Sequence, residues 1–186
     1  AVVNVSVRSP LPVVLTELEI SQAQHAAVKL MKRKKKGDMR PYILFTFLLH
    51  TGLRKGETVR LVSNHLVLEN SDQPYLYVRY SDKRHIHKER KVELNADWVE
   101  DYAKYSEHYG VNERVFPWSV RLLEYRLEDI SNSAGLSKHI SFEMLRWTCA
   151  LRDFRDGMEP EKLRRKLGLS KVQWGEVRRK IRKLLE

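Results

Sequence analysis

TGLRKGE, residues 51–57, is the stretch from which the fold can be read. It follows the apolar run YILFTFLL, residues 42–49, which predicts one buried helix. Gly52 ends that helix, because glycine takes the left-handed cap conformation without strain. A second helix then begins, with Arg54 in its first turn and Glu57 on the same face. Two interpretations of Arg54 remain open: a guanidinium held ready for a phosphate, or a surface arginine paired with Glu57.

The composition indicates a basic globular protein of one domain. Its 186 residues carry 35 Lys and Arg against 24 Asp and Glu, a formal net charge of +11. This balance favours a polyanionic partner, nucleic acid first, although a merely basic protein without such a partner stays open. Cys149 is the single cysteine, so it has no internal disulfide partner, and we expect it to fill core space. No apolar run is long enough to span a membrane and no signal peptide is visible, so we expect a cytoplasmic or nucleoid-associated location.

Hydrophobic periodicity and capping residues predict a mainly α chain with one small sheet (α+β). Helices are expected over residues 16–32, 38–50, 54–61, 95–108, 118–133, 142–156, 160–167 and 171–185. The first of them should bury a face that begins at Leu18. Between the third and fourth helices the apolar period changes to two, which predicts a three-stranded antiparallel sheet over residues 65–68, 75–80 and 91–94. Its two turns fall at residues 70–72 and at the basic stretch 81–90.

The chain divides into a short arm and one domain. Residues 1–14 contain two prolines and few long apolar side chains, so we expect a linker or an irregular arm. Residues 15–186 form the domain. The run KRKKK, residues 32–36, follows the first helix and includes Lys34 and Lys35. Both a solvated helix end and non-specific contact with phosphates remain open for this run.

Two further basic sites stand out beside Arg54. The expected hairpin tip carries four cations: Lys83, Arg84, Lys88 and Arg90. Arg146 lies on an otherwise rather apolar helix. An arginine among such neighbours must pair with an acidic residue or face a cleft, and both alternatives remain open.

The order of these features resembles the catalytic domain of tyrosine recombinases, the phage integrase family. A buried helix is followed by T-G-L-R-x-x-E, a small sheet with a basic hairpin, a helix carrying L-R-x-T, and then L-G. VFP at residues 115–117 and ISFEMLRWT at residues 140–148 resemble further segments of that family. The likeness extends from about residue 15 to the C-terminus. It implies the fold of that catalytic domain and double-stranded DNA as partner. The N-terminal core-binding domain that usually precedes it is not expected in residues 1–14.

The resemblance implies roles for individual side chains. Members of the family cut one DNA strand through a tyrosine, while two arginines hold the scissile phosphate and a hairpin lysine protonates the leaving oxygen. By position, Arg54 and Arg146 correspond to the two arginines, and Glu57 to the carboxylate that supports the first. Lys83 is the first choice for the lysine, and Lys88 is the alternative. Preorganised cations of this kind would stabilise the charge that develops on a reacting phosphoryl group.

The sequence departs from the family pattern at three reactive positions. Glu143 stands at the first histidine position, Leu169 at the later His/Trp position, and Arg178 near the expected place of the tyrosine. Residues 171–186 contain no tyrosine, and nucleophilic catalysis needs its nucleophile. We therefore expect a domain that binds DNA and does not cleave it alone. Two alternatives stay open: an active recombinase whose tyrosine lies beyond residue 186, and a structural or protein-interaction module.

Some remaining features are less specific. His139 is a weak substitute for the missing histidine, and Trp174 is more typical of a core anchor than of a replacement for the His/Trp position. No metal or cofactor is expected, because His85 and His87 alone do not make a metal site. The last helix is amphipathic, so it can pack within the chain or support self-association.

Overall fold

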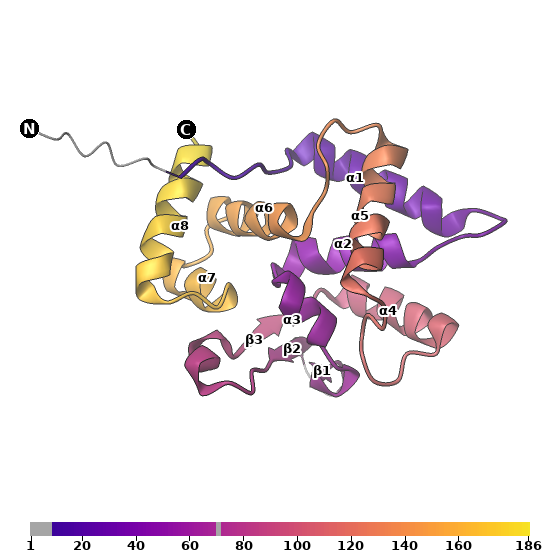
Figure 1. Cartoon of the computed structure of the whole chain (residues 1–186), viewed down its shortest axis with the longest axis horizontal. Coiled ribbons are helices and arrows are strands. Elements are labelled where there is room, and N and C mark those ends of the chain that lie inside the picture. Colours follow the sequence, from indigo (N-terminus) through magenta and orange to yellow (C-terminus); the bar gives the residue numbers. More distant parts are fainter. Residues whose placement is uncertain (1–8, 70–71) are drawn as a thin grey trace, which may run out of the picture.

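The computed structural model of the protein describes residues 9–69 and 72–186, and helices dominate that part of the chain (Figure 1). The helices are α1 Glu17–Lys32, α2 Arg40–Thr51, α3 Lys55–Arg60, α4 Ala96–Tyr109, α5 Val120–Ala134, α6 Phe142–Arg155, α7 Pro160–Lys166 and α8 Lys171–Leu184. The predicted mainly α chain is confirmed. The arm predicted over residues 1–14 falls partly outside the described residues, as does the turn predicted at residues 70–72.

Most helix ends are set by the predicted capping residues. Helix α1 begins at a capping box, in which the Glu19 N–H donates to the Thr16 hydroxyl at 3.1 Å and the Thr16 N–H donates to the Glu19 carboxylate at 2.9 Å. Gly52 ends α2 with φ of 65°. The prediction for Leu18 was wrong, since that residue is 69% exposed and Ile20 is buried instead. The buried stripe of α1 runs through Ile20 and every third or fourth residue after it, and two residues along a helix lead to a different face.

The sheet has the predicted order and direction. Strands β1 (Leu66–Val67), β2 (Tyr75–Val78) and β3 (Arg90–Glu93) are antiparallel, with β2 in the centre. Leu76 lies opposite Leu66 on one side and Val92 on the other, and the face that carries Leu76 and Val92 is buried. β2 is two residues shorter than predicted, because the Tyr80 N–H donates to the Glu89 side chain at 3.0 Å and not to β3. Between β2 and β3 the chain forms the 3₁₀ helix η2 (Lys83–Lys88).

Two apolar clusters hold the helices together. The larger one surrounds α2, in which Ile43, Phe45 and Leu48 are wholly buried. The smaller one joins the second half of α6 to α7 and α8, which lie together on one side of the molecule (Figure 1). Trp174 belongs to the smaller cluster, so the prediction of a core anchor is confirmed. Cys149 is buried beside α2, as predicted, and donates to the His50 carbonyl at 3.4 Å.

The described helices include none that is both long and apolar enough to cross a membrane.

Helix α6 connects the two apolar clusters. Its first half packs in the larger cluster and its second half in the smaller one. The loop after α7 is thereby held close to the turn between α2 and α3.

Candidate functional site: three arginines at the end of α7

Arg54 occupies the turn that joins α2 to α3. The structure makes it the N-cap of α3, one position before the predicted first turn. Its backbone N–H donates to one oxygen of the Glu57 carboxylate at 3.0 Å, and its Nη1 donates to the other at 3.2 Å. The Arg54 side chain is 25% exposed, whereas that of Glu57 is 1% exposed. The buried Glu57 carboxylate therefore holds the Arg54 guanidinium on its inner side, and the opposite edge of the guanidinium stays exposed to solvent.

Glu57 is shared among several donors. Besides Arg54, it accepts from Arg90 Nη1 at 2.8 Å, from Arg90 Nη2 at 2.9 Å and from the Tyr80 hydroxyl. Burial alone would raise the pKa of Glu57, but the hydrogen bonds and the charge of Arg90 outweigh burial and lower it to about 2. The carboxylate is therefore ionised at neutral pH.

Arg90 lies in this buried network and not at the hairpin tip, so the predicted position was wrong. It is the first residue of β3, and its side chain is 5% exposed. In addition to Glu57, it donates to the carbonyls of Lys88 and Lys166, both at 2.6 Å. The side chain points inward because the chain re-enters the sheet at this residue. Its guanidinium can position neighbouring groups, but in this arrangement it has little surface to offer DNA.

Arg146 comes from α6 and meets Arg54 from the other side. Its Nη1 donates to the Gly52 carbonyl at 2.8 Å. No acidic side chain of the described residues lies within 4.0 Å of it, so the alternative of a structural acidic partner does not hold there. Burial, followed by the charges of Arg54 and Arg90, lowers the pKa of Arg146 to about 9. The group stays charged at neutral pH and lacks a counterion of its own among the described residues.

Three consecutive backbone carbonyls at the end of α7 complete the site. We call Arg54, Arg90 and Arg146 the arginine cluster, and each of its members donates to one of these carbonyls. The pairs are Arg90 Nε to Lys166 O at 2.6 Å, Arg146 Nη2 to Leu167 O at 2.6 Å, and Arg54 Nη2 to Gly168 O at 3.0 Å. The C-terminal end of a helix carries partial negative charge, which suits three cations.

Gly168 is required where these groups converge. Its φ is +65°, a conformation that side chains disfavour. A Cβ added there would lie 2.5 Å from Arg90 Nη1 and 3.1 Å from Arg54 Nη1. The L-G pattern seen in the sequence thus has a physical reason, since only glycine lets the guanidiniums approach the chain this closely.

The positive charge of the arginine cluster is only partly neutralised by its neighbours. Among the described residues, Glu57 is the one carboxylate paired with the cluster, and it contacts Arg54 and Arg90 but not Arg146. This leaves an excess of +2, because the backbone carbonyls are neutral. A guanidinium has five N–H donors. Arg54 and Arg146 each use two of them on groups within the described residues. The remaining donors can bind an oxyanion such as a phosphate in the bidentate way.

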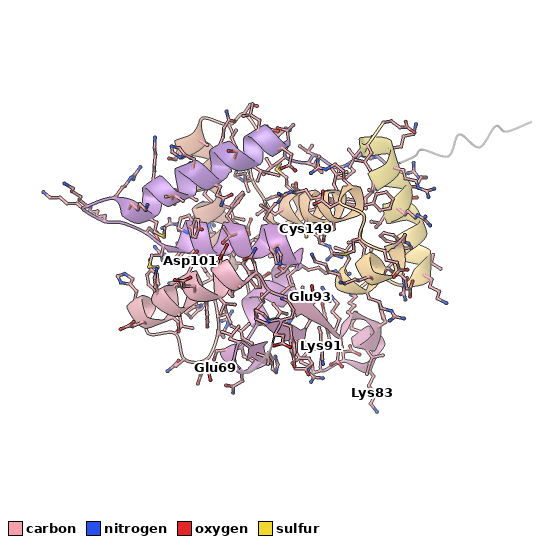
Figure 2. All side chains as sticks on the ribbon, turned by 180° about the vertical axis from the view of Figure 1, so that it is seen from behind. Glu69, Lys83, Lys91, Glu93, Asp101 and Cys149 are labelled. Atoms are coloured by element: carbon pink, nitrogen blue, oxygen red, sulfur yellow. The ribbon has the colours of Figure 1, made fainter. Side chains whose placement is uncertain are left out.

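The structure separates the two candidate lysines. Lys83 and Arg84 are exposed on η2; Lys83 projects outward from the molecule (Figure 2), and Arg84 pairs with Asp82 at 2.7 Å. Lys88 lines a pocket together with Arg54, and its ammonium lies 5.7 Å from the centre of the Tyr80 ring. Burial and the charge of Arg54 lower the pKa of Lys88. Lys88, the alternative in the sequence, is thus the lysine beside the cluster.

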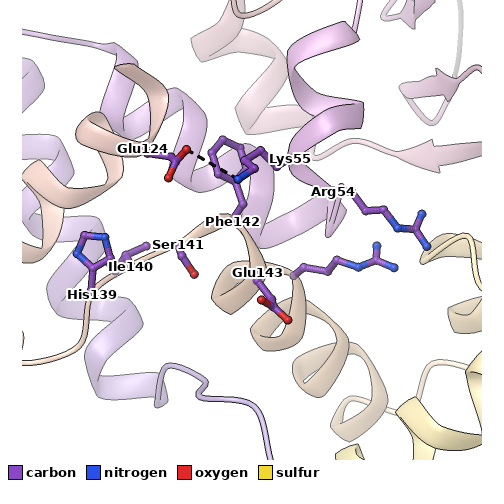
Figure 3. Close-up of a pocket in the computed structure, with 9 residues that line it drawn as sticks. Arg54, Lys55, Glu124, His139, Ile140, Ser141, Phe142 and Glu143 are labelled. Carbon is purple, nitrogen blue, oxygen red and sulfur yellow. Dashed lines mark ion pairs between the residues drawn. The ribbon is translucent and has the colours of Figure 1, made fainter. Parts of the chain in front are cut away.

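Two of the substituted positions lie near the cluster and add no cation to it. Glu143 is exposed at the rim of a pocket of about 420 Å³ that Arg54 and Arg146 also line, and it forms no ion pair with either (Figure 3). His139 lies across that pocket from Arg54 (Figure 3). Leu169 follows Gly168 and is buried in the smaller apolar cluster.

The other predicted positions lie elsewhere. Arg178 is half-buried on α8, and its Nε has no hydrogen-bond partner within the described residues. Lys34 and Lys35 are exposed in the loop between α1 and α2, which projects at the opposite end of the molecule from α7 (Figure 1). The structure does not bring these two lysines to the arginine cluster.

Sequence reasoning missed Tyr80 and the three carbonyls. Tyr80 reaches Glu57 across 23 positions of sequence, and no local pattern signals such a contact. Backbone carbonyls carry no side-chain signal at all. Only the glycine after Leu167 indicated that the chain approaches another group closely at this point.

Known proteins share this fold. The model of the phage integrase family matches residues 14–174. The crystal structure of XerA recombinase superposes with a TM-score of 0.73 at 23% identity, covering 95% of this chain and 63% of that one. XerH recombinase in a pre-cleavage complex with its difH substrate gives 0.75 at 21% identity, covering 91% and 50%. A lambda integrase dimer bound to a COC′ core site gives 0.66 at 19% identity, covering 91% and 49%.

The likeness to these solved structures is one of fold, and it confirms the predicted recombinase-like catalytic-domain fold. The chain spans less than two thirds of the length of each of the three. No curated protein sequence matches it.

Proposed function

Because the chain belongs to the phage integrase family, we propose that it is a DNA-binding recombinase domain whose arginine cluster holds one backbone phosphate of double-stranded DNA. The observation that carries the proposal is the excess charge of +2 beside free N–H donors of Arg54 and Arg146. A phosphate diester carries one negative charge, so it would offset half of this excess without displacing the three carbonyls.

The surroundings of the cluster support a polyanion. The net charge of +11 attracts DNA at long range. Lys88 is close enough to the pocket of Arg54 to meet the same phosphate or the next one. The exposed Lys83 and Arg84 can add contacts from the hairpin, and Lys34 and Lys35 can add non-specific ones at a distance. These last four roles stay predictions.

We further propose that this chain binds DNA without cutting it alone. Arginines that hold a phosphate lower the barrier only when a nucleophile attacks it. Helix α8 carries no tyrosine, and Glu143 and Leu169 replace polar groups that would assist. An active recombinase whose tyrosine lies beyond Glu186 is the alternative, and the presence of both Arg54 and Arg146 supports it. Reading the coding sequence past residue 186 separates the two, because the alternative requires a tyrosine there. Independently, a covalent protein–DNA adduct formed by this chain on a nicked duplex would overturn the inactive assignment.

The phosphate site is tested by binding to a duplex of mixed sequence at several salt concentrations. Arg54→Ala and Arg146→Ala should each lower the affinity about tenfold or more, the value of a charge-assisted contact. Each should also reduce the slope of log affinity against log salt by about 0.9. Arg179→Ala is the matched control, because it removes one positive charge from an ion pair with Glu176 on α8. Unchanged affinity in both cluster variants would refute the proposal and favour a structural or protein-interaction module.

Self-association through α8 is a further proposal. The helix packs within the chain through Trp174 and Ile181, while Val172 is 87% exposed and Leu185 is 41% exposed. Light scattering at increasing concentration would detect a dimer, and Val172→Asp should abolish it if this surface is responsible.

A DNA partner would place the protein in the cytoplasm at the nucleoid, and this location also stays a prediction.

A further inference from the structure

Tyr80 joins the basic hairpin to the arginine cluster. It follows β2 and precedes η2, and its hydroxyl donates to the Glu57 carboxylate that holds Arg54 and Arg90. The side chain is only partly buried, so one part of its ring faces the pocket of Arg54. The hydroxyl is the polar end of a rigid side chain, so this hydrogen bond fixes the position of the whole ring.

The ring in turn contacts the cations of the hairpin and of α3. The Lys88 ammonium lies 5.7 Å from its centre, and the Arg60 guanidinium lies 5.5 Å from it. The His85 ring packs at 5.6 Å between centroids. A cation over an aromatic face is attracted by the negative face of the ring. The lysine has no acidic partner within 4.0 Å among the described residues, so the ring is the main side-chain contact that orients it.

The backbone on both sides of the hairpin tip is fastened to the same network. The Tyr80 N–H donates to the Glu89 carboxylate at 3.0 Å, which closes the tip at its base. Arg90 donates to the Lys88 carbonyl at 2.6 Å. The backbone of Lys88 is therefore held by Arg90, and its side chain is guided by Tyr80.

We propose that Tyr80 is a positioning residue that holds the Lys88 ammonium beside Arg54, so that both meet the DNA backbone together. The inference rests on the proposed phosphate site and adds a residue to which no role has been assigned. Glu57 keeps both arginines as partners when Tyr80 is replaced, so the arginine cluster itself stays assembled. Removing the Tyr80 ring should therefore leave the Lys88 side chain without a fixed orientation.

The test is a double-mutant cycle in duplex binding. Lys88→Ala should lower the affinity about tenfold and reduce the salt slope by about 0.9, as expected for one phosphate contact. Tyr80→Leu should lower the affinity and the slope in the same direction. In the Lys88→Ala background, Tyr80→Leu should change neither the affinity nor the salt slope, because the Lys88 contact that Tyr80 positions is already absent. Tyr80→Phe enters a second cycle should the leucine variant fold poorly. It keeps the ring and loses the hydrogen bond that fixes the ring, so its loss of affinity should be smaller than that of Tyr80→Leu and should also disappear in the Lys88→Ala background.

Tyr77→Leu is the matched control. Tyr77 lies on β2, three residues before Tyr80, and its ring also contacts two cations, Arg79 and Lys91, but on the outer face of the sheet. Its replacement should leave the salt slope unchanged. Equal losses from the Tyr80 variants with and without Lys88 would overturn the inference, and so would an unchanged slope in Lys88→Ala. If Arg54→Ala and Arg146→Ala still weaken binding, the proposed phosphate site survives that failure.

Discussion

Arg90 and Glu57 form a bidentate ion pair, in which two guanidinium nitrogens lie 2.8 and 2.9 Å from the two carboxylate oxygens. Both side chains are almost wholly buried, with exposures of 5% and 1%. The pair joins β3 to α3 across 33 positions of sequence. Because Arg90 takes both oxygens, Glu57 holds Arg54 in place without fully neutralising it. This sharing leaves charge available at a site that an anion can reach.

Replacing Glu57 should therefore destabilise the fold. In Glu57→Gln the shape is kept, but the amide group would turn N–H donors toward those of Arg90, and buried charges would lose the counterion that they share. Removing one partner of a buried pair costs about 3–5 kcal/mol. Urea unfolding measures the loss in free energy of unfolding. Glu124→Gln is the control, because Glu124 is half-exposed in a long contact of 3.8 Å with Lys55 and should cost almost nothing.

The same carboxylate should make stability depend on pH in the acid range. The pKa of Glu57 is lowered from 4.5 to about 2 in the folded chain. A lowered folded pKa means that the unfolded chain takes up its proton first, so the stabilisation is complete above about pH 5 and is lost as the pH falls toward 2. The full effect is about 3 kcal/mol. In unfolding measurements from pH 6 down to pH 2, the free energy of unfolding of the unmodified protein should fall toward that of the Glu57→Gln variant. A constant difference in free energy between the two proteins would contradict the lowered pKa of Glu57.

Cys149 should behave as an unreactive thiol. Burial raises its pKa to about 12, and the thiolate is the form that reacts. An aromatic disulfide reagent should therefore modify the native protein far more slowly than the protein unfolded in urea. Bound DNA should not alter the native rate, because the thiol lies among the residues under α2 and not in the pockets beside the arginine cluster. Rapid modification of the native chain would show that this part of the core opens readily.

The sequence predicted the secondary structure well, since its information is local. Capping residues such as Thr16 and the left-handed Gly52 decide where helices begin and end within a few positions. The error at Leu18 came from choosing between two apolar faces of one helix, which depends on what packs against it. Local patterns also could not place Arg54 and Arg146 in one site, and only the resemblance to a family predicted that they meet.

The rest of the site depended on contacts between distant segments. Arg90 ends a basic stretch that begins with the exposed Lys83 and Arg84, and only the re-entry of the chain into β3 turns it inward. The choice between Lys83 and Lys88 depended on the path of η2, which no short motif specifies. The contact from Tyr80 to Glu57 joins a strand end to a helix start. The roles of these residues in DNA contact stay predictions until binding is measured.

Gly168→Ala should weaken DNA binding as well as the fold. The new methyl group would have to share space with Arg90 Nη1 at 2.5 Å and Arg54 Nη1 at 3.1 Å, so the guanidiniums must move away from the carbonyls that position them. Gly135→Ala is a control matched in backbone conformation, because Gly135 has φ of +66° and no neighbour within 4 Å of the added atom.

Both glycine variants should lose about 1 kcal/mol of stability, the cost of a side chain at positive φ. Only Gly168→Ala should go beyond that loss and also lower the affinity for a duplex, by about tenfold for the displacement of one arginine contact. Chemical unfolding and fluorescence anisotropy measure the two effects on the same samples. Equal stability losses in the two variants, with unchanged DNA affinity in both, would mean that the loop after α7 shifts away freely and does not set the positions of Arg54 and Arg90.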